Sequence, residues 1–552
     1  MANYYELKAE EARKICPTDI FPFKTTDELE SYDQIIGQSR AVRSMEFGLQ
    51  VNREGYNIYM AGPVGTGKAT YAKQITEDMA KDEPNPDDWC YVYNFDNHDQ
   101  PLAISFPAGE GKKFVKRMKN LLKNLLVEIP LAFETEEYER KKLDLINQYK
   151  DIKRNLMVEL ENYAQERGFL IEEKRSGLIT IPEVDGRAIS DEEYDQLDPR
   201  VREVYEEESA RIEKKANEIF RRGKKREREF KEALQGLDEA IGRQVVDNLF
   251  QDLFDIYRDC PQVIDYLKSY RKDVMKSLDD FRTEDEMELS LLNEEDDETE
   301  FLPYQVNLFI DNSETRGAPV IYETNPTYYR LTGKVEYVSK MGSLYTSFMQ
   351  IKPGALHKAN GGYLILSVRD LLLNPEAWLA LKRIMKTQEI QIENLGENYG
   401  LVAVSSLHPA PIPLNVKIIL MGSPQLYYLL LNYDPDFKKL FKIKADFEDV
   451  MDRDEENILK MARFINKYSE DKSLLPFHVS GVGKLVEYSS RLSGEQGKLS
   501  TRFNQIIEII NEAEGWAKLE GANYVYGEYV TKAVAEKTYR NKKYEDLIRE
   551  RI

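Results

Sequence analysis

The spacing of apolar positions along this 552-residue chain changes character twice. In the first part, short apolar runs at Tyr56–Ala61 and Trp89–Asn94 follow a helical pattern at Ser39–Val51. Short runs rich in β-prone residues predict buried strands. Similar runs return later, at Val306–Ile310, Val320–Glu323, Tyr363–Leu366 and Val416–Met421. The order of these elements predicts an α/β core built on a parallel sheet.

The middle of the chain has a different pattern. From about Lys112 to Phe281, apolar residues recur every three to four positions among Lys, Glu and Arg, which predicts long helices with coiled-coil character. Residues 168–190 interrupt this pattern with alternating apolar and polar positions around Ser176-Gly177 and Asp185-Gly186. We expect a β-hairpin unit at the end of a helical arm. The acidic run 284–300 predicts a solvated linker.

These changes predict four parts. Residues 1–111 form a leader and the first part of the α/β core, 112–300 the helical arm with its hairpin and acidic linker, 301–451 the rest of the core, and 452–552 an α-helical lid.

Composition narrows the class of protein. The net charge of −21 argues against a nucleic-acid-binding protein, which usually presents a basic face. Cys16, Cys90 and Cys260 are far apart and form no CxxC pair, which fits a reducing cytoplasm. The sequence has no apolar stretch of about 18 residues and no signal peptide at its start, so we expect no membrane span.

The sharpest motif has the spacing GxxxxGK between a predicted strand and a predicted helix: Gly62, Pro63, Val64, Gly65, Thr66, Gly67, Lys68. Such loops turn backbone N–H groups toward phosphates, and Lys68 would reach the β- and γ-phosphates of ATP or ADP. The next position should carry a hydroxyl for Mg²⁺, but Ala69 stands there. Thr70 lies about 100° further around the helix and cannot substitute. Phosphate binding is expected, with Mg²⁺ positioning impaired.

Many ordered segments are similar to Lon-like proteases whose AAA+ module carries a helical insertion. They are LESYDQIIGQSRAVRSMEFGL, GYNIYMAGPVGTGK, YVYNFDN, APVIYETNPTYYRLTGKVEY, GALHKANGGYLIL, AWLALKRIMKTQEIQIE, VKIILMGSPQLYYLL, DPDFKKLFKIKADFE and GKLSTRF. The resemblance implies an AAA+ fold, a ring of six copies, and unfolded or damaged proteins as substrates. In the family a Ser-Lys peptidase domain follows the lid, and we expect no such site within these 552 residues.

The resemblance also assigns roles to single residues. Ile36 and Gly37, with Ile35, resemble the segment that lines the adenine pocket, and Lys68 the phosphate-binding lysine. Ser423 sits where a polar sensor of the γ-phosphate belongs, and Arg502 resembles the lid arginine that senses nucleotide. Lys438, Lys439 and Lys442 lie where a neighbour-supplied finger is expected, but no arginine is present.

The catalytic carboxylates of such AAA+ proteins are missing from their places. In these proteins the strand after a Gly-Gly pair ends in Asp-Glu, which hold Mg²⁺ and activate water. After Gly361-Gly362 those places hold Ser367 and Val368. Asp370, three residues on, is either a substitute carboxylate or a helix N-cap. We therefore expect weak or absent hydrolysis, since these groups contribute orders of magnitude to phosphoryl transfer.

Residues 332–348 resemble the loops that face the central pore of AAA+ rings. Tyr337, Val338 and Tyr345 could grip an extended polypeptide without reading its sequence. The alternative is a plain β-hairpin with one exposed edge.

Three functions stay open on the sequence alone. The first is an ATP-dependent unfolding module that feeds a Lon-type peptidase. The second is a ring scaffold or gate that binds nucleotide weakly or not at all, similar to the ATP-independent branch of Lon-like proteases. The third is a non-proteolytic chaperone that binds client proteins through its helical arm.

Overall fold

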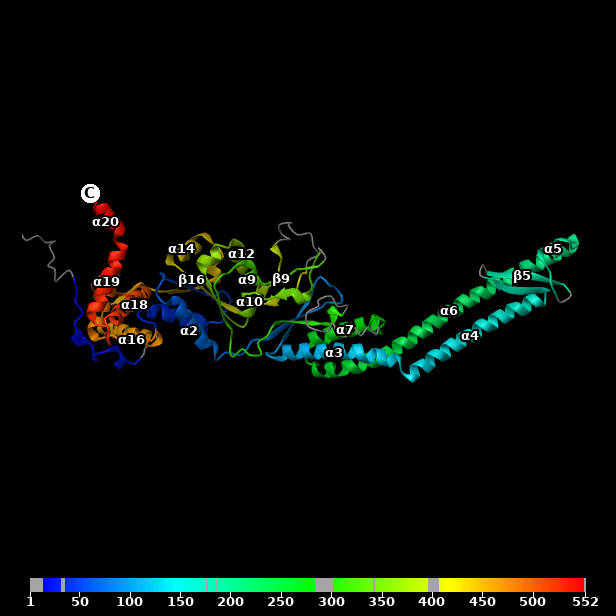
Figure 1. Ribbon diagram of the computed structural model, residues 1–552, viewed down its shortest axis with the longest axis horizontal. Helices are drawn as coiled ribbons and strands as arrows, with labels where there is room; N and C mark the ends of the chain where they lie inside the picture. The colour runs from blue at the N-terminus through cyan, green and yellow to red at the C-terminus, as the bar shows by residue number, and fades with distance from the viewer. Residues whose placement is uncertain are drawn as a thin grey trace, which may run out of the picture. The chain divides into compact units, whose positions relative to one another are not determined.

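The computed structural model describes residues 13–30, 35–174, 177–184, 187–282, 301–340, 343–395 and 407–550 (Figure 1). The acidic run 284–300 lies outside the described residues, as do Ser176, Asp185 and Gly186. The chain divides into two compact units. One contains Met1–Val92, Asp99–Lys113 and Val306–Ile552, and the other contains Tyr93–His98 and Phe114–Gln305.

The first unit is built on a five-stranded sheet in the order β17-β1-β16-β13-β8, and every pair of neighbours is parallel. This confirms the predicted α/β core with a parallel sheet. Because the strands are parallel, the loops after β1, β13 and β16 leave from the same edge. The strands are β1 (Ile58–Ala61), β8 (Val320–Glu323), β13 (Gly362–Ser367), β16 (Val416–Gly422) and β17 (Ile443–Asp446).

Helices cover both faces of this sheet because alternate strand residues point to opposite sides. Ile58 and Met60 of β1 pack in a core with α1 (Ser39–Gln50) and α2 (Lys68–Ala80). Tyr59 and Ala61 pack on the other side, in a core with the helices α10 (Ala355–Lys358), α11 (Val368–Leu372), α12 (Pro375–Thr387), α14 (Pro424–Tyr433) and α15 (Phe437–Leu440).

Two of the expected strands pair outside the parallel sheet. β2 (Asp88–Val92) pairs antiparallel with β7 (Val306–Ile310) and with β3 (Leu102–Phe106), a strand that the apolar pattern did not predict. The buried carboxylate of Asp88 accepts hydrogen bonds from the backbone N–H groups of Gly109, Gly111 and Asn312. It thereby ties β2 to the first turn of the helix that begins at Glu110.

Four helices of the lid, α16 to α19, pack around one apolar core that also takes up Cys16, Ile20, Phe21, Phe23 and Ile36. A short antiparallel pair, β18 (Val450–Asp452) with β19 (Lys498–Ser500), connects the α/β core to the lid. The lid helices are α16 (Glu455–Asp471), α17 (Val479–Ser493), α18 (Phe503–Leu519), α19 (Gly527–Asn541) and α20 (Lys543–Arg549).

Short elements complete the first unit, and η1 and η2 among them contact the lid helices α17 and α16. They are η1 (Thr18–Ile20), η2 (Thr26–Glu28), α9 (Tyr328–Thr332), β9 (Lys334–Val335), β10 (Val338–Lys340), β11 (Ser343–Tyr345), η5 (Phe348–Gln350), β12 (Ile351–Lys352), β14 (Glu389–Ile390) and β15 (Ile412–Pro413).

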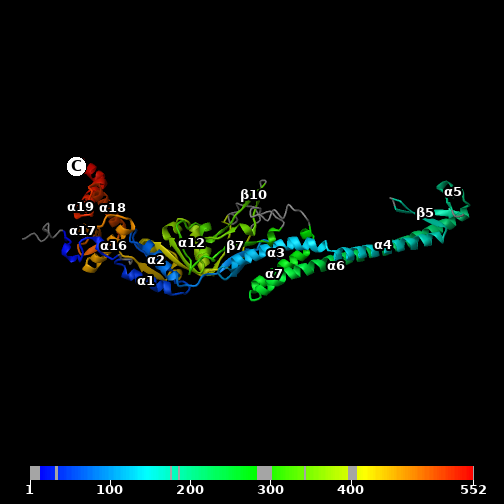
Figure 2. The ribbon, with the colours of Figure 1, turned by 60° about the horizontal axis from the view of Figure 1, so that its bottom comes forward.

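The second unit is the helical arm, in which α4 and α6 lie side by side and run in opposite directions (Figures 1 and 2). The rings of Tyr149 and Phe230 stack at 4.8 Å, and further along the pair Glu159 accepts hydrogen bonds from Arg222. The helices of the arm are α3 (Glu110–Phe133), α4 (Glu136–Gln165), α6 (Pro199–Ile256) and α7 (Pro261–Lys276), with η3 (Asp280–Arg282) and η4 (Leu302–Tyr304).

At the tip of the arm, the expected hairpin is a three-stranded antiparallel sheet. It consists of β4 (Phe169–Lys174), β5 (Gly177–Val184) and β6 (Arg187–Ala188), followed by α5 (Asp191–Asp195). Phe169 packs with Ala164 and Ile212, which anchors the sheet on both long helices. Among the helices that the structure describes, none has the length and apolar character needed to cross a membrane.

Two glycines of α6 are expected to respond oppositely to alanine. A Cβ at Gly223 would meet no atom within 4 Å, whereas a Cβ at Gly242 would lie 2.6 Å from the Cδ1 of Leu278. Gly223→Ala should therefore stabilise the arm by about 0.5–1 kcal/mol through helix propensity. Gly242→Ala should destabilise it, because Leu278 must move. Thermal unfolding followed by circular dichroism measures both; a destabilising Gly223→Ala would contradict the helix as described.

Candidate nucleotide site

The predicted phosphate loop joins the end of β1 to the start of α2. Gly65 and Gly67 have φ angles of +90° and +77°, a backbone region that favours glycine. Thr66 is fully buried, and its hydroxyl donates to the Pro63 oxygen at 3.1 Å, which fixes the turn from inside. Gly67 is the N-cap of α2, so the loop ends at the N–H groups of a helix N-terminus. This arrangement fits a bound phosphate.

Lys68, the first residue of α2, turns its side chain back over the loop. Its Nζ donates to the carbonyl oxygens of Gly62 at 2.6 Å and Pro63 at 2.8 Å. Burial lowers the pKa of Lys68 to about 8. The ammonium group is therefore largely protonated at pH 7 and loses its proton within two pH units above it.

Segments distant in sequence close around the loop. Phe447 donates its N–H to the Ala61 oxygen at 2.7 Å, and a Cβ at Gly62 would lie 2.7 Å from the Cβ of Phe447. Only a glycine therefore fits at position 62. A Cβ on Gly67 would lie 3.8 Å from the Cδ1 of Ile35, so the segment predicted to line the adenine pocket borders the phosphate loop.

The rest of that segment is held by the connection to the lid. Gln38 exchanges two hydrogen bonds with the backbone of Glu448, at 2.7 and 2.9 Å. Gly37 has a φ angle of +68°, and a Cβ there would meet Met451 at 2.7 Å. Ile36 is buried in the core of the lid. Ile36 and Gly37 are thus brought to the same region as the phosphate loop.

The lid reaches the phosphate loop through α18. A Cβ on Gly65 would lie 3.3 Å from the Cβ of Asn504. Arg502, the predicted nucleotide-sensing arginine, is the N-cap of α18, and its Nη2 donates to the Asp449 Oδ2 at 2.8 Å. The arginine is therefore paired with a carboxylate of the core–lid connection, and both side chains are partly exposed.

Ser423 directly follows β16, the neighbour of β1. Its hydroxyl is the N-cap of α14 and accepts the N–H of Leu426 at 3.2 Å. Its carbonyl oxygen accepts the hydroxyl of Tyr59 at 3.0 Å. Ser423 thus lies at the correct edge of the sheet, with its hydroxyl used to cap a helix.

The positions expected to hold Mg²⁺ supply no suitable oxygen. Ala69 and Thr70 are both exposed on the first turn of α2. Ser367 is the N-cap of α11, and Val368 is 1% exposed within the apolar core. Asp370 is the third residue of α11 and not its N-cap. Among the residues that the structure describes, no cluster of metal-ligating side chains is found. These residues do not fit a magnesium site at the expected places.

The three lysines at the expected neighbour-facing segment have different environments. Lys442 donates to the Glu54 oxygen at 3.2 Å and lies over the ring of Tyr56. Lys438 and Lys439 are exposed on α15. Lys442 therefore fastens the loop between α1 and β1, and the other two stay available at the surface.

The predicted pore segment forms the hairpin β10–β11, in which Val338 pairs with Tyr345. Tyr337 accepts a hydrogen bond from Asn394 at 2.9 Å and is only partly exposed. Leu344, which the sequence reasoning did not single out, is 50% exposed on β11. The hairpin therefore presents Leu344 more openly than either tyrosine.

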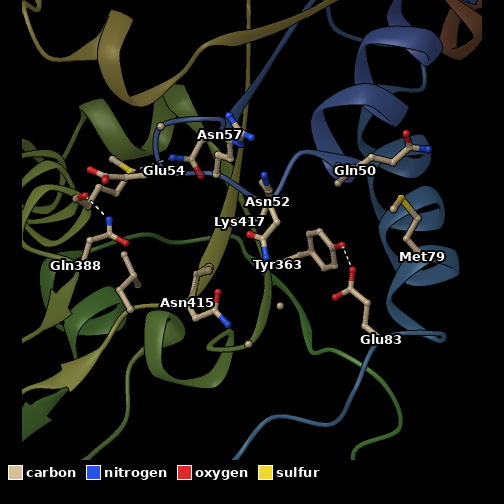
Figure 3. A pocket seen from close by; sticks show the side chains of 18 of the residues that line it. Gln50, Asn52, Glu54, Asn57, Met79, Glu83, Tyr363, Gln388, Asn415 and Lys417 are labelled. Atoms are coloured by element: carbon tan, nitrogen blue, oxygen red, sulfur yellow. Dashed lines mark hydrogen bonds between the residues drawn. The ribbon is translucent and has the colours of Figure 1, made fainter.

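A cavity of about 510 Å³ lies away from the phosphate loop, at the amino ends of β13 and β16 (Figure 3). Tyr363 donates to Glu83 at 2.5 Å there. Lys417 donates to the carbonyl oxygens of Val51 and Tyr56 beyond the end of α1. None of the predicted nucleotide-binding residues lines this cavity, and two of its charged groups, Glu83 and Lys417, hold chain segments together.

Comparison with known proteins matches three parts of the chain. Residues 316–448 match the LonB-like AAA domain, 476–540 the archaeal LonB AAA+ ATPase lid domain, and 88–121 the Lon-like LonC helical domain. The phosphate loop lies outside these three ranges, whereas β13, Ser423 and Arg502 lie within them.

Similar proteins include Lon homologs from bacteria and archaea. A Lon protease homolog of Escherichia coli K12 is 27% identical over 29% of this chain and 27% of its own length. The Lon proteases of Archaeoglobus fulgidus and Methanothermobacter thermautotrophicus are 23% and 32% identical, over 41% and 18% of this chain and 36% and 16% of theirs. The matches thus span about a third of these relatives or less. Solved structures of NtrX from Brucella abortus match 38% of this chain and 43% of theirs at 17% identity, with a TM-score of only 0.27.

The fold and the lid define an AAA+ module. Parts of the chain are similar to the AAA domain and the lid of Lon-like proteins, in agreement with the resemblance seen in the sequence.

We expect nucleotide affinity to fall about tenfold between pH 7 and pH 9, because the pKa of Lys68 is about 8 and the phosphates bind its protonated form. Titration with a fluorescent ATP analogue at several pH values tests this. Lys68→Ala should bind more weakly and show no such pH dependence. A flat profile for the unaltered chain would show that Lys68 does not contact the phosphates.

Proposed function

We propose that this chain is the substrate-handling AAA+ module of a Lon-like protease, which binds ATP or ADP at the phosphate loop and hydrolyses it weakly or not at all. The proposed substrates are unfolded or damaged proteins, and the proposed assembly is a ring of six copies in the cytoplasm. The relatives are Lon proteases and Lon protease homologs, which supports a role in proteolysis.

The observation that carries the proposal is the contrast between two halves of the site. The phosphate-binding half is complete, with left-handed glycines at 65 and 67 and Lys68 over the loop. In the hydrolytic half, Val368 occupies the place of the glutamate, and its side chain is buried in the apolar core. A glutamate there would face burial among apolar side chains, which carries a large desolvation cost. Such a site would use nucleotide to set the arrangement of core and lid and not to drive repeated turnover.

A non-proteolytic chaperone ring is the second candidate. The arm favours it, because its tip carries apolar side chains at the surface, with Leu170 at 39% and Ile179 at 38% exposure. Client capture by the arm alone, with no need for a peptidase, would be the corresponding activity.

Nucleotide binding and turnover should separate in the purified chain. We expect a fluorescent ATP analogue to bind, with phosphate release near the background of Lys68→Ala. Measurable turnover that Lys68→Ala abolishes would contradict the proposal and indicate an active motor that recruits another carboxylate, such as Asp370. No binding at all would leave a passive scaffold.

The hairpin β10–β11 should contribute to polypeptide binding through Leu344. Leu344→Ser should weaken binding of a fluorescent unfolded protein several-fold, since it removes exposed apolar area from the proposed pore surface. Leu519→Ser is the matched control, because Leu519 is 78% exposed on the lid. Equal effects of both substitutions, measured by fluorescence anisotropy, would remove the special role of the hairpin.

A further inference from the structure

A second cavity, of about 550 Å³, lies in the lid between α17 and α19. We call it the lid cavity; its charged lining residues are Arg13, Lys14, Arg453, Lys484, Glu487, Arg491 and Glu495. No residue of the phosphate loop is among the described residues that line it. Its volume falls within the range of about 300–1,000 Å³ typical of small-molecule sites.

The charge of the lid cavity is opposite to that of the whole protein. Five of its lining side chains are cationic and two are carboxylates, which gives a local net charge of +3. The chain as a whole has 98 acidic and 77 basic residues and a net charge of −21. The cationic residues come from three separate segments of the chain, so the fold gathers them in one place.

One of the two carboxylates is already neutralised. The side chain of Glu487 is only 7% exposed and pairs with Arg13 and with Lys484 at 3.1 Å. The backbone N–H of Cys16 donates to it at 3.2 Å. Burial alone raises the pKa of Glu487, but these hydrogen bonds outweigh it and keep the pKa below its usual range. Among the described residues that line the cavity, Glu495 is the other carboxylate that faces Lys14, Arg453 and Arg491.

The end of α17 reduces the positive charge only slightly. The helix ends at Ser493 and contributes a partial charge of roughly −0.5 at its C-terminus. Arg453 donates to the Ser490 hydroxyl at 3.4 Å and to the Gln496 oxygen at 3.5 Å. These two long contacts, with a further hydrogen bond to the Cys16 sulfur, orient the guanidinium group but do not use all five of its N–H donors. The cavity keeps a clear excess of positive charge and two arginines able to bind an anion.

We propose that the lid cavity binds a small oxyanion with at least two negative charges, preferably one bearing phosphate groups, through Arg453 and Arg491. Guanidinium groups bind phosphate oxygens in a bidentate way that lysine cannot reproduce. The hydroxyls of Ser490 and Thr531 line the same cavity and can donate further hydrogen bonds. This site is separate from the phosphate loop and does not depend on the function proposed for it.

Pyrophosphate is the probe, titrated by calorimetry without Mg²⁺ at 150 mM NaCl into full-length Lys68→Ala, in which the phosphate loop is disabled. We expect binding that falls at least tenfold when Arg453→Gln and Arg491→Gln are added. Adding Arg463→Gln and Lys472→Gln instead removes two exposed cations of the lid outside the cavity and should leave binding unchanged. No binding to Lys68→Ala, or an equal loss in this control, would overturn the proposal.

Two further measurements complete the test. Lys14→Gln changes an exposed side chain at the cavity, carries little risk to folding, and should weaken pyrophosphate binding a few-fold. An unchanged affinity for pyrophosphate would mean that Lys14 does not contribute to binding, and it would contradict binding in the lid cavity. Citrate, a carboxylate anion, should bind at least tenfold more weakly than pyrophosphate, and equal binding would overturn the preference for phosphate.

Discussion

The pairing of β1 with both β16 and β17 is the constraint on which the site depends. It places the phosphate loop between the end of β16, where Ser423 lies, and the end of β17, where the chain continues through Phe447 toward the lid. The hydrogen bond from Phe447 to Ala61 extends this pairing by one residue past β17. Core, phosphate loop and lid are therefore coupled through the backbone.

The sequence predicted the local parts of this arrangement and missed those that come from distant segments. The phosphate loop is recognisable because seven consecutive residues, 62–68, carry the pattern. Phe447 and Asn504 also shape the loop, but they lie hundreds of residues away and belong to no spacing rule. The strand Leu102–Phe106 escaped notice because it is short and one end is exposed. The hydrogen bond that holds Tyr337 to Asn394 could not be foreseen, since it joins two irregular segments.

The two cationic regions of the first unit differ in how their charge is held. Lys68 is a single half-buried ammonium group that faces backbone carbonyls, and its lowered pKa makes its charge respond to pH. The lid cavity combines five cationic side chains with two carboxylates, and one of these carboxylates, Glu487, is already paired. Anion binding at Lys68 would therefore depend on pH, whereas anion binding in the lid cavity would depend mainly on salt concentration.

The position of Lys68 makes phosphate binding an exchange. Its ammonium group already donates hydrogen bonds to two carbonyl oxygens of the loop. These bonds must break before the ammonium group can bind a phosphate. The carbonyls of Gly62 and Pro63 would then need other donors, such as water. The affinity of the loop thus reflects a difference between two well-bonded states, and small changes in the loop's hydration would alter it as much as a change in the ligand.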